Sequence, residues 1–209
     1  MKGALQKNLE YGEKYIQKIG NSVIPEMIKN LVFSSRNILD LGCGDGALIQ
    51  AILKEFPNKK ITGVDISPRR IDSLKKRFPK KTFICGDISH IRLKRGVFDL
   101  VLSTQVIEHI KDDKKMIEEM NKLLKKSGFL YVSSVIKKPW AIYKYRNKGR
   151  FVLDPTHERE YKSKEEFLSL FKNKFKLIKL KIYPVKRKKI FTIRIPGYYI
   201  IEALWKKRK

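Results

Sequence analysis

The segment ILDLGCGDG at residues 38–46 constrains the fold of this 209-residue chain more than any other feature. A short apolar run leads directly into glycines at every second position, and a helical pattern follows over residues 47–56. Glycines permit positive φ angles and let a ligand approach the backbone closely. The helix behind them offers free N–H groups. The pattern therefore predicts a strand–turn–helix unit that binds a ligand at its turn.

An acidic residue at the end of the next strand-like run adds to this signal. Asp65 lies 23 residues after Gly42, within the run at residues 60–66. A carboxylate at this place can accept both hydroxyls of an adenosine ribose. The turn and the acid together predict an adenosine-containing cofactor, and the alternative is a tight turn beside a surface carboxylate.

Two cofactors fit such a turn. Gly42, Gly44 and Ala47 satisfy the GxGxxA pattern of dinucleotide-binding proteins, so NAD is one alternative. Asp40, near the end of the first strand, disfavours a pyrophosphate and suits the ammonium or sulfonium of S-adenosylmethionine. The chain also has little room for a separate dehydrogenase substrate domain. We therefore favour S-adenosylmethionine.

The hydrophobic pattern alternates between strand-like and helical runs, which indicates a doubly wound, mostly parallel α/β sheet. The expected strands are residues 37–41, 60–66, 82–85, 97–103 and 129–135. The expected helices between them are residues 47–56, 68–78 and 112–126. After these we expect a helix at 163–173, strands at 175–183 and 190–195, and a final helix at 197–205.

Composition narrows the class of protein further. Only Cys43 and Cys85 occur, without CxxC or Cys/His clustering, which excludes a disulfide framework and the common zinc sites. We expect a cytoplasmic protein without a metal, since two isolated cysteines fit a reducing compartment. No run reaches about 18 uncharged apolar residues, so we expect no membrane-spanning helix.

The charge is strongly basic and unevenly distributed. The net charge is +27, of which residues 137–209 carry +17. This excess suggests a basic face that attracts RNA or an anionic membrane surface. The tail at 195–209 places aromatic and apolar residues before four cations, a pattern that suits either a bilayer surface or a docked helix. A general lysine-rich bias of composition is the alternative explanation.

Five motifs in residues 35–136 resemble the class I S-adenosylmethionine-dependent methyltransferases. ILDLGCGDG resembles the first family motif, GVDIS the second, GDIS at 86–89 the third, and FDLVLSTQVIEHI the segment at the fourth strand. LLKKSGFLYVSS resembles the approach to the fifth strand. The similarity is greatest to the small-molecule, type 11-like branch that includes ubiquinone and menaquinone biosynthesis methyltransferases.

This resemblance implies a Rossmann-like, doubly wound α/β fold with a seven-stranded sheet. The implied strand order is 3-2-1-4-5-7-6, with the last strand antiparallel. It also implies a single domain, with N-terminal helices at 1–34, a cofactor-binding core at 35–136, an acceptor-side lid at 137–162, and a C-terminal helix, hairpin and basic tail at 163–209.

The resemblance further implies positions for the cofactor. The side of the site that holds the methionine moiety is formed by the turn, namely Asp40, Gly42, Cys43 and Gly44. The ribose and adenine would contact Asp65, Ile66, Asp87 and Ile88. The methyl-donor end would be bordered by Ser103, Thr104 and Gln105.

Methyl transfer is an in-line displacement, so alignment supplies much of the rate, and a general base matters only when the acceptor must lose a proton. His109 and His157 are the candidate catalytic residues, each with a structural role as the alternative. Candidate substrate-binding residues follow the fifth strand: Trp140, Tyr143, Arg146 and Tyr161.

We expect a small-molecule acceptor, with a lipid- or glycan-linked molecule among the candidates. Basic and aromatic residues interleave at 137–151, which would equally suit stacked RNA bases. The alternatives are therefore an RNA methyltransferase and a non-catalytic module that binds nucleic acid or membrane on a methyltransferase fold.

Overall fold

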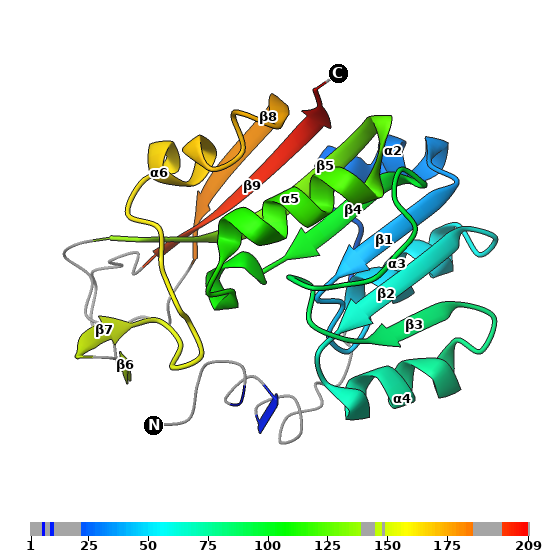
Figure 1. The fold of residues 1–209 in the computed structure, drawn as a ribbon, viewed down its shortest axis with the longest axis horizontal. Helices are drawn as coiled ribbons and strands as arrows, with labels where there is room; N and C mark the ends of the chain where they lie inside the picture. The colour runs from blue at the N-terminus through cyan, green and yellow to red at the C-terminus, as the bar shows by residue number, and fades with distance from the viewer. Residues whose placement is uncertain are drawn as a thin grey trace, which may run out of the picture.

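The computed structural model describes residues 6, 9–10, 22–138, 145–147, 149–185 and 198–208. Its main feature is a seven-stranded sheet with helices on both faces (Figure 1). The strands of this sheet are β1 Asn37–Leu41, β2 Lys60–Asp65, β3 Thr82–Cys85, β4 Phe98–Thr104, β5 Leu124–Lys137, β8 Phe175–Pro184 and β9 Tyr198–Lys207. The helices are η1 Glu26–Ile28, α2 Lys29–Ser34, α3 Ala47–Glu55, α4 Pro68–Arg77, η2 Ile107–His109, α5 Asp113–Leu123 and α6 Lys164–Ser169.

The strand order is β3-β2-β1-β4-β5-β9-β8. Counted along the chain within this sheet, that order is 3-2-1-4-5-7-6, as the family resemblance implied. The first five strands are mutually parallel, and β9 is antiparallel to both β5 and β8. The α/β fold and the doubly wound sheet are thus confirmed.

Two apolar layers hold the helices to the sheet. On one face α5 and α6 contribute Met116, Met120 and Phe167 to a buried cluster. On the other face α3 and α4 contribute Ile52 and Leu74 to a second cluster. Because both faces are covered, the inner strands are apolar on both sides, as parallel sheets require. In Figure 1 the hairpin of β6 Tyr145–Asn147 and β7 Arg150–Val152 lies apart from this sheet.

The predicted final helix at 197–205 is wrong, because these residues form most of β9. Ile201, Ala203, Leu204 and Trp205 are all buried, and the Trp205 ring stacks on Phe171 at 4.8 Å. A strand with both faces covered lacks the polar alternation that marks a surface strand, so its apolar run imitates a helix. The predicted strand at 190–195 lies outside the described residues.

The carboxyl ends of β1, β2, β3 and β4 meet at one edge of the sheet because these strands are parallel. In open α/β sheets this edge is where ligands bind. The glycine turn, Asp65, Asp87 and Gln105 all follow strand ends there. The fold therefore brings together residues that lie more than sixty positions apart in the chain.

Candidate functional site

The glycine turn after β1 contains three residues with left-handed backbone: Gly42, Gly44 and Gly46, with φ of 76°, 53° and 79°. A Cβ at Gly42 would lie 2.4 Å from the side chain of Val106, and one at Gly46 would lie 2.4 Å from that of Leu74. A Cβ at Gly44 would meet nothing within 4 Å. Packing thus explains the outer two glycines, whereas the middle one faces open space.

Asp65 joins the turn to the second strand. One carboxylate oxygen accepts a hydrogen bond from the Gly44 N–H at 2.9 Å, and the other accepts from the Ser67 N–H at 3.0 Å. The turn itself is fastened to β2 because the Gly42 and Cys43 N–H groups both donate to the Val64 carbonyl, at 2.7 and 2.9 Å. These bonds fix the glycine turn beside a buried negative charge.

Asp40 lies beneath the same turn and is only 2% exposed. Its Oδ1 has no hydrogen-bond partner among the described residues. Burial, and then the negative charge of Asp65, raise the pKa of Asp40 to about 7. An orphaned carboxylate is costly unless a cation or a donor approaches it. Together with the open space at Gly44, this fits a ligand that carries positive charge, such as S-adenosylmethionine.

The third strand end holds Asp87. Its carboxylate accepts from the Ser89 N–H at 2.8 Å and lies 3.2 Å from His90 Nδ1. Partial burial opposes ionisation, but these hydrogen bonds from Ser89 and His90 lower the pKa of Asp87. Ile88 is buried in the core cluster, whereas Ile66 is half-buried. The ionised Asp87 could accept a hydrogen bond from an adenine amino group.

The fourth strand end holds a strained residue. Gln105 has φ of 55°, and no other non-glycine residue described by the structure has a positive φ. Its N–H donates to the Ser133 carbonyl at 3.0 Å and its side-chain amide to Ser133 Oγ at 3.3 Å. The neighbouring Ser103 Oγ is buried without a partner in the described part of the chain, and Thr104 is half-buried. Such strain persists only where surrounding contacts enforce it, and it concentrates at functional sites.

The two candidate catalytic histidines lie together, although 48 positions separate them. Their rings contact edge to face with centroids 4.8 Å apart. His109 Nδ1 lies 3.0 Å from Thr156 Oγ1, and His157 Nδ1 lies 2.8 Å from a Glu160 carboxylate oxygen. Burial, and then the neighbouring His157, lower the pKa of His109 to about 4. His109 is therefore neutral at pH 7.

Glu108 completes this cluster and is fully buried. Its Oε2 accepts from Ser134 Oγ at 2.8 Å, and its backbone carbonyl accepts from the N–H groups of Glu158 and Arg159. Burial raises the pKa of Glu108 to about 7. Glu108, His109 and His157 offer ligand atoms within 4.8 Å of one another. Carboxylate oxygens and imidazole nitrogens are ligand types that bind zinc. The absence of a metal remains a prediction.

Sequence analysis singled out neither Thr156 nor Glu160, which hold the two histidines. The available signal was the segment DPTHERE at 154–160, where polar residues gather around one histidine before the α6 helix. The i,i+3 spacing of His157 and Glu160 does not identify the pair, because these residues lie outside a helix.

The candidate substrate-binding residues do not form one group in the described structure. Tyr161 is 2% exposed, and its ring lies 5.1 Å from that of Phe167 in the core. Arg146 is exposed, with its guanidinium 4.6 Å above the Phe151 ring. Trp140 and Tyr143 lie outside the described residues. The role of these four positions stays a prediction.

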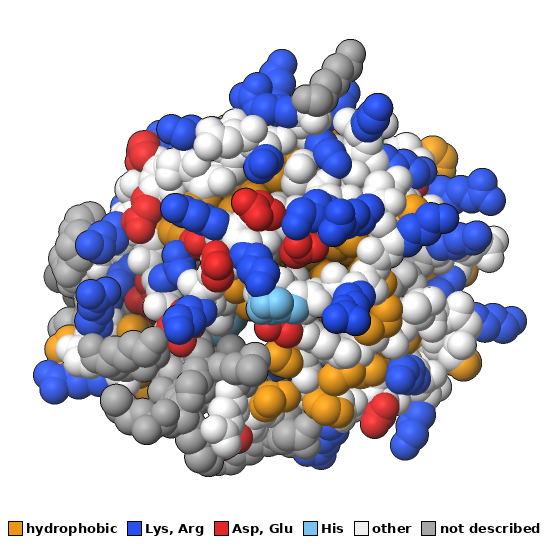
Figure 2. Space-filling view, in the orientation of Figure 1, with side chains coloured by type: hydrophobic (Ala, Val, Ile, Leu, Met, Phe, Trp, Pro, Cys, Tyr) orange, Lys and Arg blue, Asp and Glu red, His pale blue; other side chains and the backbone are white. Residues whose placement is uncertain are grey.

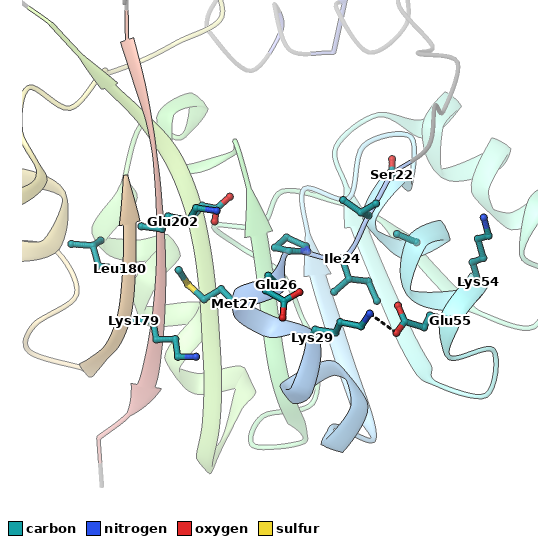
Figure 3. Close-up of a pocket in the computed structure, with 14 residues that line it drawn as sticks. Ser22, Ile24, Glu26, Met27, Lys29, Lys54, Glu55, Lys179, Leu180 and Glu202 are labelled. Carbon is teal, nitrogen blue, oxygen red and sulfur yellow. Dashed lines mark ion pairs between the residues drawn. The ribbon is translucent and has the colours of Figure 1, made fainter. Parts of the chain in front are cut away.

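A separate hollow of about 1240 Å³ lies between η1, α3 and strands β8 and β9 (Figure 3). Its lining includes the ion pair of Lys29 and Glu55, whose charged atoms are 3.0 Å apart, and the side chain of Glu202. None of the residues predicted to bind cofactor or acceptor lines it. The hollow is therefore distinct from the edge that carries the glycine turn.

Comparisons with known proteins support the same interpretation. Residues 39–132 match the family model described as a methyltransferase domain. The chain is 32% identical over 122 residues to malonyl-[acyl-carrier protein] O-methyltransferase of Priestia megaterium, covering 57% of this chain and 44% of that protein. It is 29% identical over 111 residues to ubiquinone biosynthesis O-methyltransferase of Coxiella burnetii, covering 51% of this chain and 47% of that protein. The chain thus spans about half the length of these relatives.

The crystal structure of N-methyltransferase NodS from Bradyrhizobium japonicum, in complex with S-adenosyl-L-homocysteine, has the same fold. The TM-score is 0.66 at 15% identity, and the alignment covers all of both chains. The chain therefore has the Rossmann-like fold of this methyltransferase structure. Residues 39–132 are similar in sequence to the class I S-adenosylmethionine-dependent methyltransferases, as their motifs indicated.

The buried Glu108 makes a prediction about stability and pH. Its carboxyl has a pKa of about 7 in the folded protein against 4.5 in the unfolded chain, so the folded state holds the proton more tightly. This contribution to stability is complete below pH 4.5 and is lost as the pH rises to about 7, on the order of 3 kcal/mol in all.

We expect Glu108→Gln, which keeps an acceptor for Ser134, to flatten this dependence. Urea unfolding at several pH values measures it. An unchanged slope between wild type and variant would show that Glu108 is not the titrating group, and Asp40→Asn provides the comparison because its carboxyl has a similar shift.

Proposed function

We propose that the protein transfers a methyl group from S-adenosylmethionine to an oxygen atom of a small molecule. The observation that carries this proposal is the buried, unpartnered Asp40 carboxylate beneath a glycine turn that is open at Gly44. The oxygen acceptor is proposed because both named relatives are O-methyltransferases. Lipid-linked and carrier-linked acceptors are the chemical classes to test first, and glycan-linked acceptors follow.

We assign the cofactor as follows. The turn holds the methionine end through Asp40, Gly42, Cys43 and Gly44. The ribose and adenine are held by Asp65, Ile66, Asp87 and Ile88, and the methyl-donor end by Ser103, Thr104 and Gln105. When bound, the cofactor supplies an electrophilic methyl group on a sulfonium. The protein supplies the negative charge that binds this cation and the alignment that the displacement requires.

For the acceptor side, we propose that His157 removes the proton from the acceptor hydroxyl and that Glu160 orients its ring. A carboxylate at Nδ1 fixes the tautomer of a histidine and stabilises the imidazolium that forms. The 2.8 Å contact between His157 and Glu160 supports this role. His109, held neutral and bonded to Thr156, packs against His157 and keeps its ring in place.

The RNA methyltransferase and the non-catalytic binding module remain alternatives that no observation of the described residues favours. Of the aromatic residues at 137–151 that suggested RNA binding, Trp140 and Tyr143 lie outside the described part of the chain, and Tyr145 and Phe151 are exposed. A reducing, cytoplasmic location is supported by the two free cysteines. Within the part of the chain that the structure covers, no helix has the length and apolarity needed to cross a bilayer.

Gly44→Ala tests the cofactor site. The new methyl group would enter the open space at the turn, so we expect the affinity for S-adenosylhomocysteine to fall on the order of ten-fold or more. The matched control is Gly96→Ala, because Gly96 also has a left-handed φ, of 65°, and open space around it, but lies near the opposite edge of the sheet.

Both variants should lose about 1 kcal/mol of stability from backbone strain. Calorimetric titration should then show lost affinity for Gly44→Ala alone. Equal affinity in the two variants would remove the turn from the binding site, and NAD in place of S-adenosylhomocysteine would test the dinucleotide alternative.

Asp40 makes binding of the cofactor dependent on pH. Only the ionised carboxylate attracts the cationic ligand, and its pKa is about 7. We expect the affinity for S-adenosylmethionine to rise about ten-fold between about pH 6 and about pH 8. Asp40→Asn should bind more weakly at the higher pH and show little pH dependence. A wild-type affinity that is constant over this interval would contradict the role of Asp40.

His157→Asn separates binding from turnover. Asparagine keeps a donor toward Glu160 but provides no base, so we expect unchanged cofactor affinity and a rate reduced roughly 10²- to 10⁴-fold. Release of S-adenosylhomocysteine is measured with hydroxyl-bearing lipids as acceptors. The rate of Glu160→Gln should lie between those of His157→Asn and the wild type, and its dependence on pH should be shifted. A full rate in His157→Asn would assign the histidine a structural role only.

A further inference from the structure

Among the described residues, strand β8 lies at the edge of the sheet and pairs with β9 alone. Residues 172–185 contain five lysines and no acidic residue. Those lysines are exposed, and no described residue forms an ion pair with them: Lys172, Lys174, Lys176, Lys179 and Lys181. This segment is therefore a concentrated band of positive charge.

The same strand exposes apolar side chains. Of the eight large hydrophobic residues described as exposed, four lie on β8: Leu177, Ile178, Leu180 and Ile182, each 36–42% exposed. Leu180 and Ile182 pair with Ala203 and Ile201 of β9, so they share one face, while Lys179 and Lys181 pair with residues of the opposite face. The edge strand therefore presents an apolar row on one face of the sheet and a cationic row on the other.

The global charge does not by itself explain this arrangement. Figure 2 shows Lys and Arg side chains spread over the whole visible face, with acidic side chains among them near its centre. Some basic residues elsewhere have acidic partners, such as Lys125 with Asp99 and Arg159 with Asp113. On β8 the lysines form no ion pair among the described residues, although Lys181 lies opposite Glu202 of β9, and they adjoin exposed apolar groups. Exposed cations beside apolar groups favour an anionic lipid surface.

We propose that β8 docks the protein onto an anionic membrane surface, with its lysines at the headgroups and its apolar row at the boundary below them. A second copy of the chain is disfavoured, since edge-to-edge pairing would bring lysines together. β8 would enter the membrane no further than the hydrated headgroup region, because the backbone N–H and C=O groups of an open strand edge find no hydrogen-bond partners in hydrocarbon.

This surface replaces the one that the sequence of the tail suggested. Tyr198–Lys207 is the inner strand β9 and is not available as a surface helix. β8 is parallel to β5, so its carboxyl end at Pro184 lies at the same sheet edge as the glycine turn. Docking along β8 would bring that edge near the lipid. The proposal itself depends only on the strand and not on the methyltransferase activity.

The test is sedimentation of the full chain with vesicles. We expect binding to vesicles that contain phosphatidylglycerol, loss of binding at high salt, and no binding to pure phosphatidylcholine. Replacing Lys176, Lys179 and Lys181 by Gln should weaken binding on the order of 100-fold, since each lysine contributes about a five-fold factor. The matched control replaces three exposed lysines on α4 and the turn after it by Gln: Lys75, Lys76 and Lys80.

The β8 lysines have no ion-pair partner among the described residues, so both triple variants should keep the wild-type melting temperature and the wild-type affinity for S-adenosylhomocysteine. Leu180→Gln with Ile182→Gln tests the apolar row, and we expect weaker sedimentation. Equal losses in the two lysine variants, binding to neutral vesicles, or no binding at all would overturn the proposal. So would a β8 variant that loses affinity for polyuridylate RNA but still sediments with the anionic vesicles.

Discussion

The hydrogen bond between the Asp65 carboxylate and the Gly44 N–H, 2.9 Å long, is the contact on which the candidate site depends. It joins the ends of two neighbouring parallel strands and holds the turn open in front of a buried acid. The second oxygen of Asp65 accepts from Ser67, the residue that caps α4 by accepting from the Arg70 N–H. One carboxylate thus sets the position of the glycine turn and the start of the following helix.

Glu108 makes a second set of contacts, at the proposed acceptor side. Its side chain accepts from Ser134 on β5, and its carbonyl accepts from two N–H groups of the segment that carries His157. The sheet edge and the segment before α6 are therefore joined through a single residue. Because Glu108 is fully buried, its carboxyl is held with a raised pKa, and the cluster is stable only with the surrounding donors in place. The glycine turn and this cluster lie at the same edge of one sheet.

Sequence patterns predicted the parts of the fold that rest on local rules. Strands β1 and β3 have the predicted bounds, and α4 begins at Pro68, where the predicted helix begins. The error at β9 has a physical cause: Ala203 and Leu204 are adjacent and both buried, because helices cover one face and the η1 side covers the other. The alternation of apolar and polar residues along a strand reflects one buried and one exposed face. A strand with both faces covered lacks this alternation.

Local sequence patterns also predicted only part of the candidate site. The turn and Asp65 could be predicted, since a glycine spacing and a strand-end acid are local features. The pairing of His157 with Glu160, the left-handed φ of Gln105 and the burial of Tyr161 could not, because they arise from contacts between segments that are distant in the chain. Such features follow from tertiary packing, and no spacing within one segment encodes them.

The charge of the whole molecule and the charge of the site have opposite signs. A net charge of +27 attracts anions over long distances, whereas the buried carboxyl groups of Asp40 and Asp65 beside the glycine turn would favour a cation at contact distance. Salt screens the first effect over roughly 8 Å at physiological ionic strength, but buried carboxylates are screened far less. The two effects can therefore coexist in one small protein: the exposed lysines act where the solvent is, and the buried acids act where it is excluded. Whether a charged group is buried or exposed, and not the net charge of the protein, would therefore determine which ligand each region attracts.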